Sequence, residues 1–453
     1  MSPENDEMMD LALKHNFWTW STQIKPEDIL HIVKSEGVYF WDFAGKRYTD
    51  MNSTVMCTNI GHSNSHVQEA MCRQIMELPF AGPHMVTDIR AKLAAKIASL
   101  TPPGLDHILY TLGGSDANEN AVKIARDYTG RTKILTRYRS YHGATMGAMA
   151  LTGDRRRVHW EPAVMPGVVH FLDPYRYRSV LLRDTYELTD EQFVNAYLRH
   201  LEEIINYEGS DKIAAILLET VTGTNGIIVP PDGYLQGVRD ICDKNGILLI
   251  TDEVMCGFGR TGKWFAFEHW NVKPDLITMA KGLTSGYAPL GVVAMKKEIA
   301  EYYNDRTFYG GLTYNGHPVS LAAAMAVIEV IENENLLENS TQRGKTLKRL
   351  LREMKEKHIC VGDFRSIGLF GVLELVKDRE TREPLMKRGE KGCTMKKVTK
   401  YLHDNGIYIK DNTHMLLVIP PLIITDEQLE EAFDVIDRSL DLADEDILTG
   451  RVS

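Results

Sequence analysis

Short apolar runs alternate with amphipathic stretches along most of the chain. Three of these runs are rich in Ile, Leu or Ala: Lys212–Leu218, Ile247–Ile250 and Leu276–Met279. Each begins directly after a Gly or an Asp. Runs this short, with this composition, predict buried strands of a parallel sheet. The stretches between the runs carry apolar residues at helical spacing, so the pattern as a whole predicts an α/β fold.

The same pattern divides the chain into a large and a smaller domain. A chain of 453 residues exceeds one typical hydrophobic core. We expect an N-terminal arm and part of the small domain in residues 1–60, the large domain in 61–325 and the rest of the small domain in 326–453. Residues 321–357 predict one long helix that joins the domains. Thr425-Asp426-Glu427-Gln428 is a capping box that predicts the start of the last helix.

Composition and charge exclude some classes of partner. Hydrophobic residues make up 43% of the chain and charged residues 25%, values typical of globular proteins. The net charge of −10 argues against a nucleic-acid partner, which needs a basic face. No apolar run reaches membrane-spanning length, so we expect no membrane contact. We interpret the short basic run Arg155-Arg156-Arg157 as a solvated loop.

The cysteines and the N-terminus bear on location. Six cysteines are scattered without a CxxC pair, at positions 57, 72, 242, 256, 360 and 393. This distribution favours a reducing compartment and argues against a disulfide framework or a zinc site, so we expect no metal. The N-terminal sequence MSPENDEMMD is acidic and has the features of neither a signal peptide nor a transit peptide. We therefore expect a cytoplasmic protein.

Two of the predicted strands end near groups with complementary chemistry. Ile247–Ile250 runs toward Asp252, and Leu276–Met279 runs toward Lys281. Open α/β sheets bind ligands beyond the carboxyl ends of their strands, so we expect this carboxylate and this amine at one crevice. Burial lowers the pKa of a lysine and frees its lone pair for attack on a carbonyl. With a carboxylate that holds a proton on a heterocycle nitrogen, this indicates the chemistry of pyridoxal 5′-phosphate (PLP). For each residue taken alone, a surface lysine or an N-capping aspartate is the alternative.

Four motifs in this region support the same interpretation. They are Asp252-Glu253-Val254, Gly257-Phe258-Gly259-Arg260-Thr261-Gly262, Pro274-Asp275 and Ala280-Lys281-Gly282. In order and spacing they resemble the class III aminotransferases of PLP fold type I, and the resemblance extends from about Glu36 to about Thr425. It implies a large domain with a mostly parallel central sheet and a smaller α+β domain built from both termini. It also implies PLP as the cofactor, Lys281 as its Schiff-base lysine, Asp252 as the partner of the pyridine nitrogen and Val254 on one ring face.

A phosphate site is expected where a glycine-rich turn enters a helix. The predicted strand Ile108–Thr111 leads into Leu112-Gly113-Gly114-Ser115-Asp116. Free N–H groups and the helix dipole favour an anion at such a helix start, although a Gly-Ser turn on its own is usually only a cap. With the resemblance, Gly114, Ser115 and Asp116 become expected cofactor contacts. Family members usually carry Glu where this chain has Asp116.

The resemblance places further residues around the cofactor. It implies that Tyr141 stacks on the ring, with His142 also in contact, whereas a core tyrosine is the alternative. Glu219 follows the predicted strand Lys212–Leu218 and is expected to face the site, with a structural carboxylate as the alternative. In the family, the Thr at the position of Thr313 binds the phosphate of the neighbouring subunit. This implies a homodimer or a dimer of dimers with shared active sites.

The resemblance also suggests four substrate contacts. Trp18 belongs to an N-terminal arm that lines the substrate entrance in the family, although packing on the chain's own domain is the alternative. Met56 stands where some ω-transaminases carry Trp. Lys410, with His414 close by, stands where many relatives use a mobile Arg to bind the acceptor's carboxylate, and a Lys there lacks the bidentate fork. Arg365 matches a family position near the entrance and is another candidate partner for an anion.

These expectations together predict transamination with ping-pong kinetics, in which Lys281 moves the proton. The pattern resembles the ω-amino-acid:pyruvate and taurine-type branches of the family. We therefore expect an amine donor that is an ω-amino acid or primary amine (β-alanine, 4-aminobutyrate or taurine-like) and pyruvate or 2-oxoglutarate as the acceptor. Another PLP reaction on the same fold (aminomutase, racemase or decarboxylase) is one alternative, which a requirement for a keto acid would separate. A non-catalytic relative is the other, which the colour of bound cofactor would test.

Overall fold

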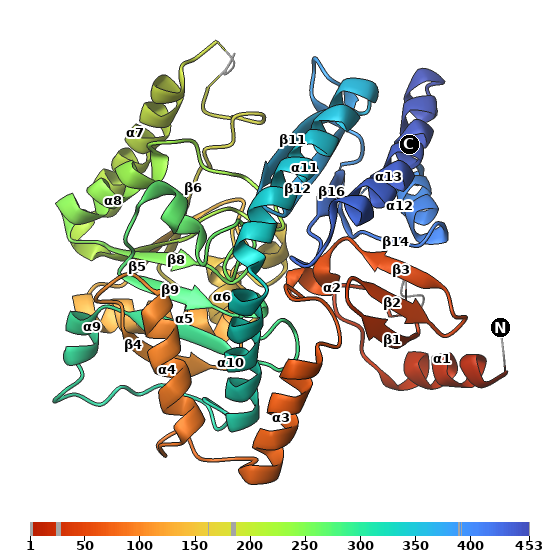
Figure 1. Cartoon of the computed structure of the whole chain (residues 1–453). Helices are drawn as coiled ribbons and strands as arrows, with labels where there is room; N and C mark the ends of the chain where they lie inside the picture. The colour runs from red at the N-terminus through yellow and green to blue at the C-terminus, as the bar shows by residue number, and fades with distance from the viewer. Residues whose placement is uncertain are drawn as a thin grey trace.

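The computed structural model describes residues 3–23, 29–161, 163–182, 187–387, 390 and 392–452. A large α/β part contains the central sheet, and a smaller part holds the strands from both ends of the chain (Figure 1). Among the described residues, no helix combines the length and the apolar composition that crossing a membrane would need.

The central sheet has seven strands in the order β4-β10-β9-β8-β7-β5-β6. Their bounds are β4 His107–Thr111, β5 Lys133–Arg137, β6 Val168–Phe171, β7 Ile213–Glu219, β8 Leu248–Asp252, β9 Leu276–Met279 and β10 Gly291–Met295. Strand β10 is antiparallel to both of its neighbours, whereas β5 to β9 are joined by parallel pairings. The predicted α/β fold with a mostly parallel central sheet is therefore confirmed.

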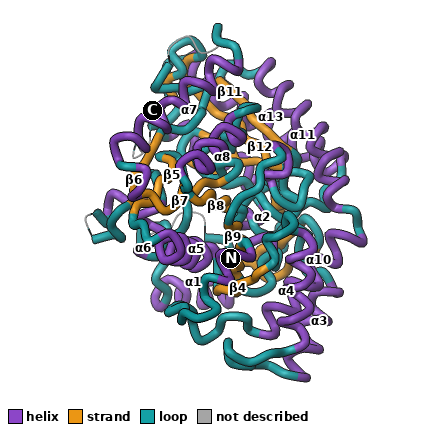
Figure 2. Tube along the Cα trace, turned by 90° about the vertical axis from the view of Figure 1, so that its left-hand side faces the viewer, coloured by secondary structure: helices purple, strands orange, loops and turns teal. Residues whose placement is uncertain are grey.

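Helices cover both faces of this sheet, as the turned view shows for α5 and α8 (Figure 2). Ile216 and Leu218 of β7 belong to one core with residues of α7 (Asp190–Glu208) and α8 (Tyr234–Asn245). Leu217 belongs to a second core, with α5 (Gly114–Thr129). Every residue of β7 is buried, which explains why this strand has a continuous apolar sequence. The remaining helices of the large part are α3 Ser65–Glu77, α4 Asp88–Leu100, α6 Met146–Leu151, α9 Lys297–Glu301 and α10 Pro318–Asn333.

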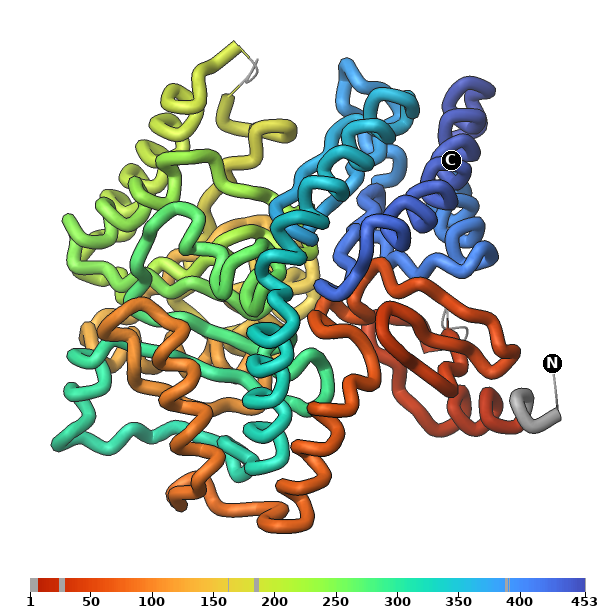
Figure 3. Tube along the Cα trace, viewed as in Figure 1, coloured from red at the N-terminus to blue at the C-terminus, as the bar shows by residue number. Residues whose placement is uncertain are grey.

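The smaller part contains strands from both ends of the chain, which lie side by side (Figure 3). Strands β1 (Ile32–Glu36), β2 (Tyr39–Asp42) and β3 (Arg47–Asp50) form an antiparallel meander, to which β14 (Ile407–Tyr408) adds in parallel. A separate antiparallel sheet is built only from the C-terminal region. Its strands are β11 Val361–Ile367, β12 Phe370–Asp378, β13 Glu383–Pro384, β15 Asp411–Asn412 and β16 Met415–Val418.

The helices of the smaller part confirm one prediction and correct another. They are α1 Pro3–His15, α2 Ser53–Met56, α11 Leu336–Lys357, α12 Cys393–Asp404 and α13 Asp426–Leu448. The predicted capping box is present, because Thr425 and Gln428 exchange side-chain hydrogen bonds at the start of α13. The single helix predicted for 321–357 is wrong: α10 ends at Asn333, and Asn335 has a left-handed backbone (φ 52°) before α11 begins.

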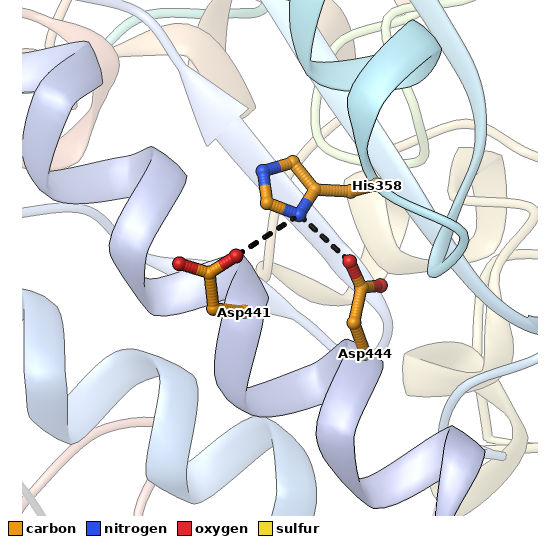
Figure 4. A group of neighbouring side chains, drawn as sticks. All are labelled: His358, Asp441 and Asp444. Atoms are coloured by element: carbon orange, nitrogen blue, oxygen red, sulfur yellow. Dashed lines mark hydrogen bonds and ion pairs between the residues drawn. The ribbon is translucent and has the colours of Figure 1, made fainter.

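A buried histidine fastens the end of α11 to α13 (Figure 4). His358 follows the last residue of α11, and its side chain is only 1% exposed. Its Nδ1 lies 2.8 Å from Oδ2 of Asp444 and 3.8 Å from Oδ1 of Asp441, and its Nε2 lies 2.8 Å from Oδ1 of Asp437. Since both ring nitrogens face carboxylates, the arrangement favours the doubly protonated imidazolium. The cluster therefore acts as an ion-paired clamp between the two helices.

Candidate active site

The pairing register of the central sheet places three polar side chains in one row. Glu219 at the end of β7 pairs with Asp252 at the end of β8, and Asp252 pairs with Thr278 of β9. Lys281 follows two residues beyond the end of β9, in a single 3₁₀ turn. The carboxylate and the amine that the sequence placed at two strand ends thus lie at the same edge of the sheet.

A cavity of about 190 Å³ lies at this edge. It is lined by Trp20, Gly114, Ser115, Asn118, Tyr141, His142, Gly143, Glu219, Thr224, Asp252, Val254, Met255 and Lys281. Most of the expected cofactor contacts are in this set, and Asp116 and Thr313 are outside it. Trp20, Asn118, Gly143, Thr224 and Met255 were not expected. They lie in loops or on the buried face of a helix, where no sequence periodicity distinguishes a pocket residue from a packing residue.

Asp252 is held in one orientation at the floor of the cavity. Its Oδ2 accepts hydrogen bonds from Nδ2 of Asn118 at 2.8 Å and lies 2.7 Å from Nδ1 of His142. Its Oδ1 accepts from the backbone N–H of Val254 at 3.0 Å. Thr278 donates to Oδ1 of Asn118 and so fixes which way that amide faces. This carboxylate is nearly inaccessible to solvent and is placed to interact with a ligand atom in the cavity.

Lys281 has the environment that nucleophilic amine chemistry requires. Burial lowers the pKa of its ammonium, although the negative charge of Asp252 partly opposes the effect. Its amine has no hydrogen-bond partner among the residues that the structure describes. Its backbone has a φ of 47°, an uncommon value for a non-glycine residue that is often found at functional sites. The amine of Lys281 is therefore available to react with a bound molecule.

The start of α5 forms a tight cradle for an anion. A Cβ atom on Gly114 would approach Cγ1 of Val254 to 2.8 Å, and one on Gly143 would approach Oγ of Ser115 to 2.1 Å. Glycine is therefore required at both positions. The free N–H groups of this 16-residue helix and the hydroxyl of Ser115 are the donors available to a phosphate. A phosphorylated, flat heterocycle fits this donor set, with Asp252 for a ring nitrogen and Lys281 for a carbonyl carbon.

The carboxylates of Asp116 and Glu219 accept hydrogen bonds from backbone groups around the site. The carboxylate of Asp116 accepts from the N–H of Leu112 at 2.9 Å and from the amide of Asn120 at 2.7 Å, which fixes the turn before α5. Glu219 lines the cavity and accepts from the N–H of Tyr141 at 3.0 Å. Burial raises the pKa of Glu219. Asp116 thus supports the phosphate turn indirectly, and Glu219 both faces the site and positions Tyr141.

Arg156, which the sequence did not predict as a site residue, contacts two residues of the cavity lining. The guanidinium carbon of Arg156 is 3.8 Å from the centroid of the Tyr141 ring, and Nη2 donates to Oγ1 of Thr224 at 3.2 Å. Its Nε donates to both carboxylate oxygens of Asp154, and the Arg156 side chain is 26% exposed. The prediction of a solvated loop for Arg155-Arg156-Arg157 is wrong, because the three residues begin a 3₁₀ helix (Arg155–His159) and the side chains of Arg156 and Arg157 are 26% and 15% exposed. The sequence feature that could have indicated a partner for Arg156 is Asp154, which directly precedes the basic run.

None of the four expected substrate contacts is among the residues that line this cavity. Trp18 lies outside the cavity lining, and Trp20 from the same arm is the aromatic that lines it. Met56 is buried in the core that includes Met255. Lys410 is outside the lining, and its Nζ lies 5.5 Å from the ring centroid of Trp20. Arg365 lies outside the lining, within a buried ion network.

Thr313 lies on the surface of the single chain. Its loop exposes large apolar side chains, among them Tyr309 at 91%. Met76 and Val86, at 86% and 87%, are also strongly exposed. Thr313 is absent from the chain's own cavity, so it reaches a cofactor site only if that site belongs to another copy.

Comparison with known proteins gives the family. The family described as aminotransferase class-III matches residues 22–440. A taurine:2-oxoglutarate aminotransferase from Bifidobacterium kashiwanohense, solved in complex with PLP and glutamate, is 41% identical with a TM-score of 0.93, and 98% of each chain is covered. A taurine–pyruvate aminotransferase from Bilophila wadsworthia is 36% identical, covering 97% of this chain and 98% of the relative. A leucine/methionine racemase from Thermococcus litoralis is 35% identical, covering 93% and 91%.

The match extends over most of the chain and includes the strand ends, the cradle and the lysine described above. The chain belongs to the class III aminotransferases. The predicted family, and with it the PLP aminotransferase fold, is thereby confirmed.

Proposed function

We propose that this enzyme transfers the amino group of an ω-amino acid or primary amine (β-alanine, 4-aminobutyrate or taurine-like) to pyruvate or 2-oxoglutarate, with PLP as its cofactor. One observation carries the proposal: the uncommitted amine of Lys281 and the fixed carboxylate of Asp252 line one cavity with a helix N-terminus. The taurine-specific names of two relatives support the substrate class.

The residues present fit PLP part by part. Ser115 and the start of α5 would hold the phosphate, Tyr141 and Val254 would lie against the ring, and Asp252 would pair with the ring nitrogen. The chemistry that PLP supplies when bound is an electron sink for the carbanion formed at the amine-bearing carbon. Asp252 contributes by holding a proton at the ring nitrogen, because its carboxylate is oriented by Asn118 and His142.

Lys281 has two roles in this proposal. Burial lowers the pKa of its ammonium and so increases the fraction of free amine, the form that would hold the cofactor. The same amine would take the proton from the amine-bearing carbon of a bound substrate. Burial of the site limits the access of water to that proton.

Arg156 is the residue that we assign to the acidic group of the substrate. It lies over Tyr141 and against Thr224, two residues of the cavity lining. Asp154 accepts from Nε and Nη2 of Arg156, and Nη2 also donates to Thr224, so Nη1 is the guanidinium nitrogen left to donate to a carboxylate or sulfonate. An ω-amino acid places its amine and its acidic group at opposite ends, which suits a lysine in the cavity lining and an arginine that contacts two other residues of that lining.

A second copy of the chain completes the site in this proposal. The exposed apolar side chains around Thr313 are of the kind that an interface between copies buries. Thr313 would then contact the phosphate bound by its neighbour, in a homodimer or a dimer of dimers with shared active sites. All six cysteines are free thiols, which supports a reducing, cytoplasmic location.

Racemisation of an amino acid is the second candidate function. It is favoured by one observation, the racemase among the relatives at 35% identity. Proton transfer by Lys281 serves both reactions, but only transamination consumes a keto acid. An enzyme that changes the configuration of an amino acid without any keto acid present would replace transamination with this second function.

The test is a screen of amine donors with pyruvate and with 2-oxoglutarate, on the native enzyme and on Arg156→Met. We expect KM for β-alanine and taurine to rise in the variant by about 10- to 100-fold, the scale of a hydrogen bond to a charged group. The loss for a neutral amine such as propylamine should be much smaller. Arg155→Met is the matched control, since Arg155 is exposed, and it should leave all donors unchanged. Equal losses for anionic and neutral donors would refute the role of Arg156.

A further inference from the structure

The turn at residues 223–226 connects the cavity to the C-terminal sheet. On the cavity side, Gly223 donates its N–H to Oε2 of Glu219 at 2.7 Å. Thr224 lines the cavity and accepts from Arg156, and Asn225 donates to Oδ2 of Asp154 at 3.2 Å. The position of this turn therefore sets the position of both residues that hold Arg156.

Two side chains from the C-terminal sheet hold the other side of the turn. Nε of Arg365 in β11 donates to the carbonyl oxygen of Gly226 at 2.8 Å. The amide of Asn412 in β15 donates to the carbonyl oxygen of Thr224. Gly226 has a φ of 124°, and a Cβ there would approach Sδ of Met415 to 3.1 Å, so the sheet packs closely on this residue.

Arg365 is itself rigidly anchored. Its Nη1 and Nη2 lie 2.5 Å from Oδ2 of Asp363 and 2.8 Å from Oε2 of Glu374, and its guanidinium carbon lies 4.7 Å from the ring centroid of Tyr175. The side chain is 13% exposed, and that of Glu374 is fully buried. Glu374 also accepts from Nε of Arg178. Each nitrogen of the Arg365 guanidinium thus has an acceptor within the chain, so the side chain is a fixed point for the turn.

We propose that Arg365 is a positioning residue that holds the turn 223–226 from the C-terminal sheet and so keeps Thr224 and Arg156 in place for the substrate's acidic group. This proposal rests on the function proposed above. It replaces the expectation that Arg365 contacts an anion directly. A shift of the C-terminal sheet relative to the large part would then move the turn. The preference for anionic over neutral amine donors would therefore depend on the position of that sheet.

The matched pair of variants is Arg365→Met and Arg178→Met. Both remove a guanidinium from Glu374 and both arginines are largely buried, at 13% and 21% exposure, but only Arg365 contacts the turn. We expect Arg365→Met to raise KM for β-alanine and taurine about tenfold, the effect of one charged hydrogen bond, with a smaller change for propylamine. Arg178→Met should leave the ratio between anionic and neutral donors at its native value.

Asn412→Ala removes the hydrogen bond from the Asn412 amide to the carbonyl oxygen of Thr224 and leaves the ion pairs of Arg365 intact. Amide hydrogen exchange of the segment 220–228, measured on each holoenzyme, gives a readout that does not depend on substrate. Exchange should be faster in Arg365→Met and Asn412→Ala than in the native enzyme and Arg178→Met. Identical exchange, or identical donor ratios, in Arg365→Met and Arg178→Met would overturn the positioning role. A native donor ratio in Arg156→Met would instead refute the substrate-binding role of Arg156 in the proposed function, because the exchange measurement tests the contact of Arg365 with the turn separately.

Discussion

Nδ1 of His142 lies 2.7 Å from Oδ2 of Asp252, and the two side chains are only 0% and 3% exposed. Nε2 of the same ring lies 3.1 Å from Oγ1 of Thr136, so the imidazole is held at both ends. Asn118 donates to the same oxygen of Asp252. Residues of the chain itself therefore orient the carboxylate, which is the preorganisation that charge stabilisation in a buried site requires.

Asp252→Asn should lower kcat strongly while some PLP stays bound, because a neutral amide cannot hold the proton of the ring nitrogen. Breaking a buried charge pair of this kind costs about 3–5 kcal/mol, which corresponds to a fall in kcat of about 150- to 5,000-fold. Steady-state kinetics with saturating PLP measures the effect. Asp211→Asn, at an exposed ion pair, is the control and should be neutral. A near-native kcat in Asp252→Asn would remove its role.

His142→Gln tests how far the orientation of Asp252 matters. We expect a smaller loss of kcat than in Asp252→Asn, because Asn118 and the N–H of Val254 still hold the carboxylate. The loss should lie near the 1.5–3 kcal/mol of about one hydrogen bond to a charged group. A loss as large as that of Asp252→Asn would mean that the imidazole itself acts in the reaction.

Lys281→Ala should abolish turnover and covalent attachment of the cofactor in a folded protein. The reason is that the cavity contains no other lysine among its lining residues. Reduction with borohydride followed by peptide mass analysis should find PLP on the peptide of Lys281 in the native enzyme and on no peptide of the variant. Lys244→Ala is the control, since that side chain is 73% exposed. Trapped PLP in Lys281→Ala would reassign the catalytic lysine.

His358 makes stability depend on pH. Burial alone would lower its pKa, but the hydrogen bonds with Asp444 and Asp437 together raise it above the usual value. Because the folded-state pKa is raised, the stabilisation is fully present below about pH 6.5, the ordinary value for histidine, and is lost as pH rises through the folded pKa. The facing groups are Asp437, Asp441 and Asp444 of α13, with Lys357 of α11 paired to Asp437.

His358→Gln should therefore lower the free energy of unfolding most in acid, by about 1.5–3 kcal/mol near pH 6, the scale of a hydrogen bond to a charged group. The difference from the native protein should narrow toward pH 9. Urea unfolding of holoenzyme across this range measures it. His66→Gln removes an exposed histidine–carboxylate pair and should change stability little at any pH. A difference that stays constant with pH would refute the clamp.

The sheet and the reactive pair were predictable because they depend on local pattern. The apolar runs that end near Glu219, Asp252 and Lys281 have strand length and composition, and parallel strands place their carboxyl ends at one edge. The break between α10 and α11 was missed, because Asn335 interrupts a stretch whose helical periodicity continues on both sides. A single left-handed residue leaves no trace in a hydrophobic pattern.

The supporting residues were not predictable for a different reason. Asn118 lies on a helix stripe next to ordinary core alanines, and only tertiary packing turns its amide toward Asp252. Arg156 was assigned to a solvated loop because a basic run usually is one, yet Asp154 and Tyr141 hold it beside the cavity. Arg365 was expected near the substrate, and the sequence does not show that Glu374 would engage it. In all three cases the contacts depend on how the chain packs, which the hydrophobic pattern does not show.

The last prediction concerns assembly. Thr313→Ala should lose PLP on dilution and recover activity with added PLP, because one hydroxyl donor to a phosphate is worth about 1.5–3 kcal/mol. Lys281→Ala is inactive because it lacks the catalytic amine. In a shared site, Lys281 comes from one chain and Thr313 from the other. A mixed dimer of the two variants therefore has one site with both substitutions and one site with neither. Co-refolded mixtures should therefore be more active than either parent at limiting PLP. An active monomer in sedimentation, or no recovery despite proven subunit exchange, would refute the shared site.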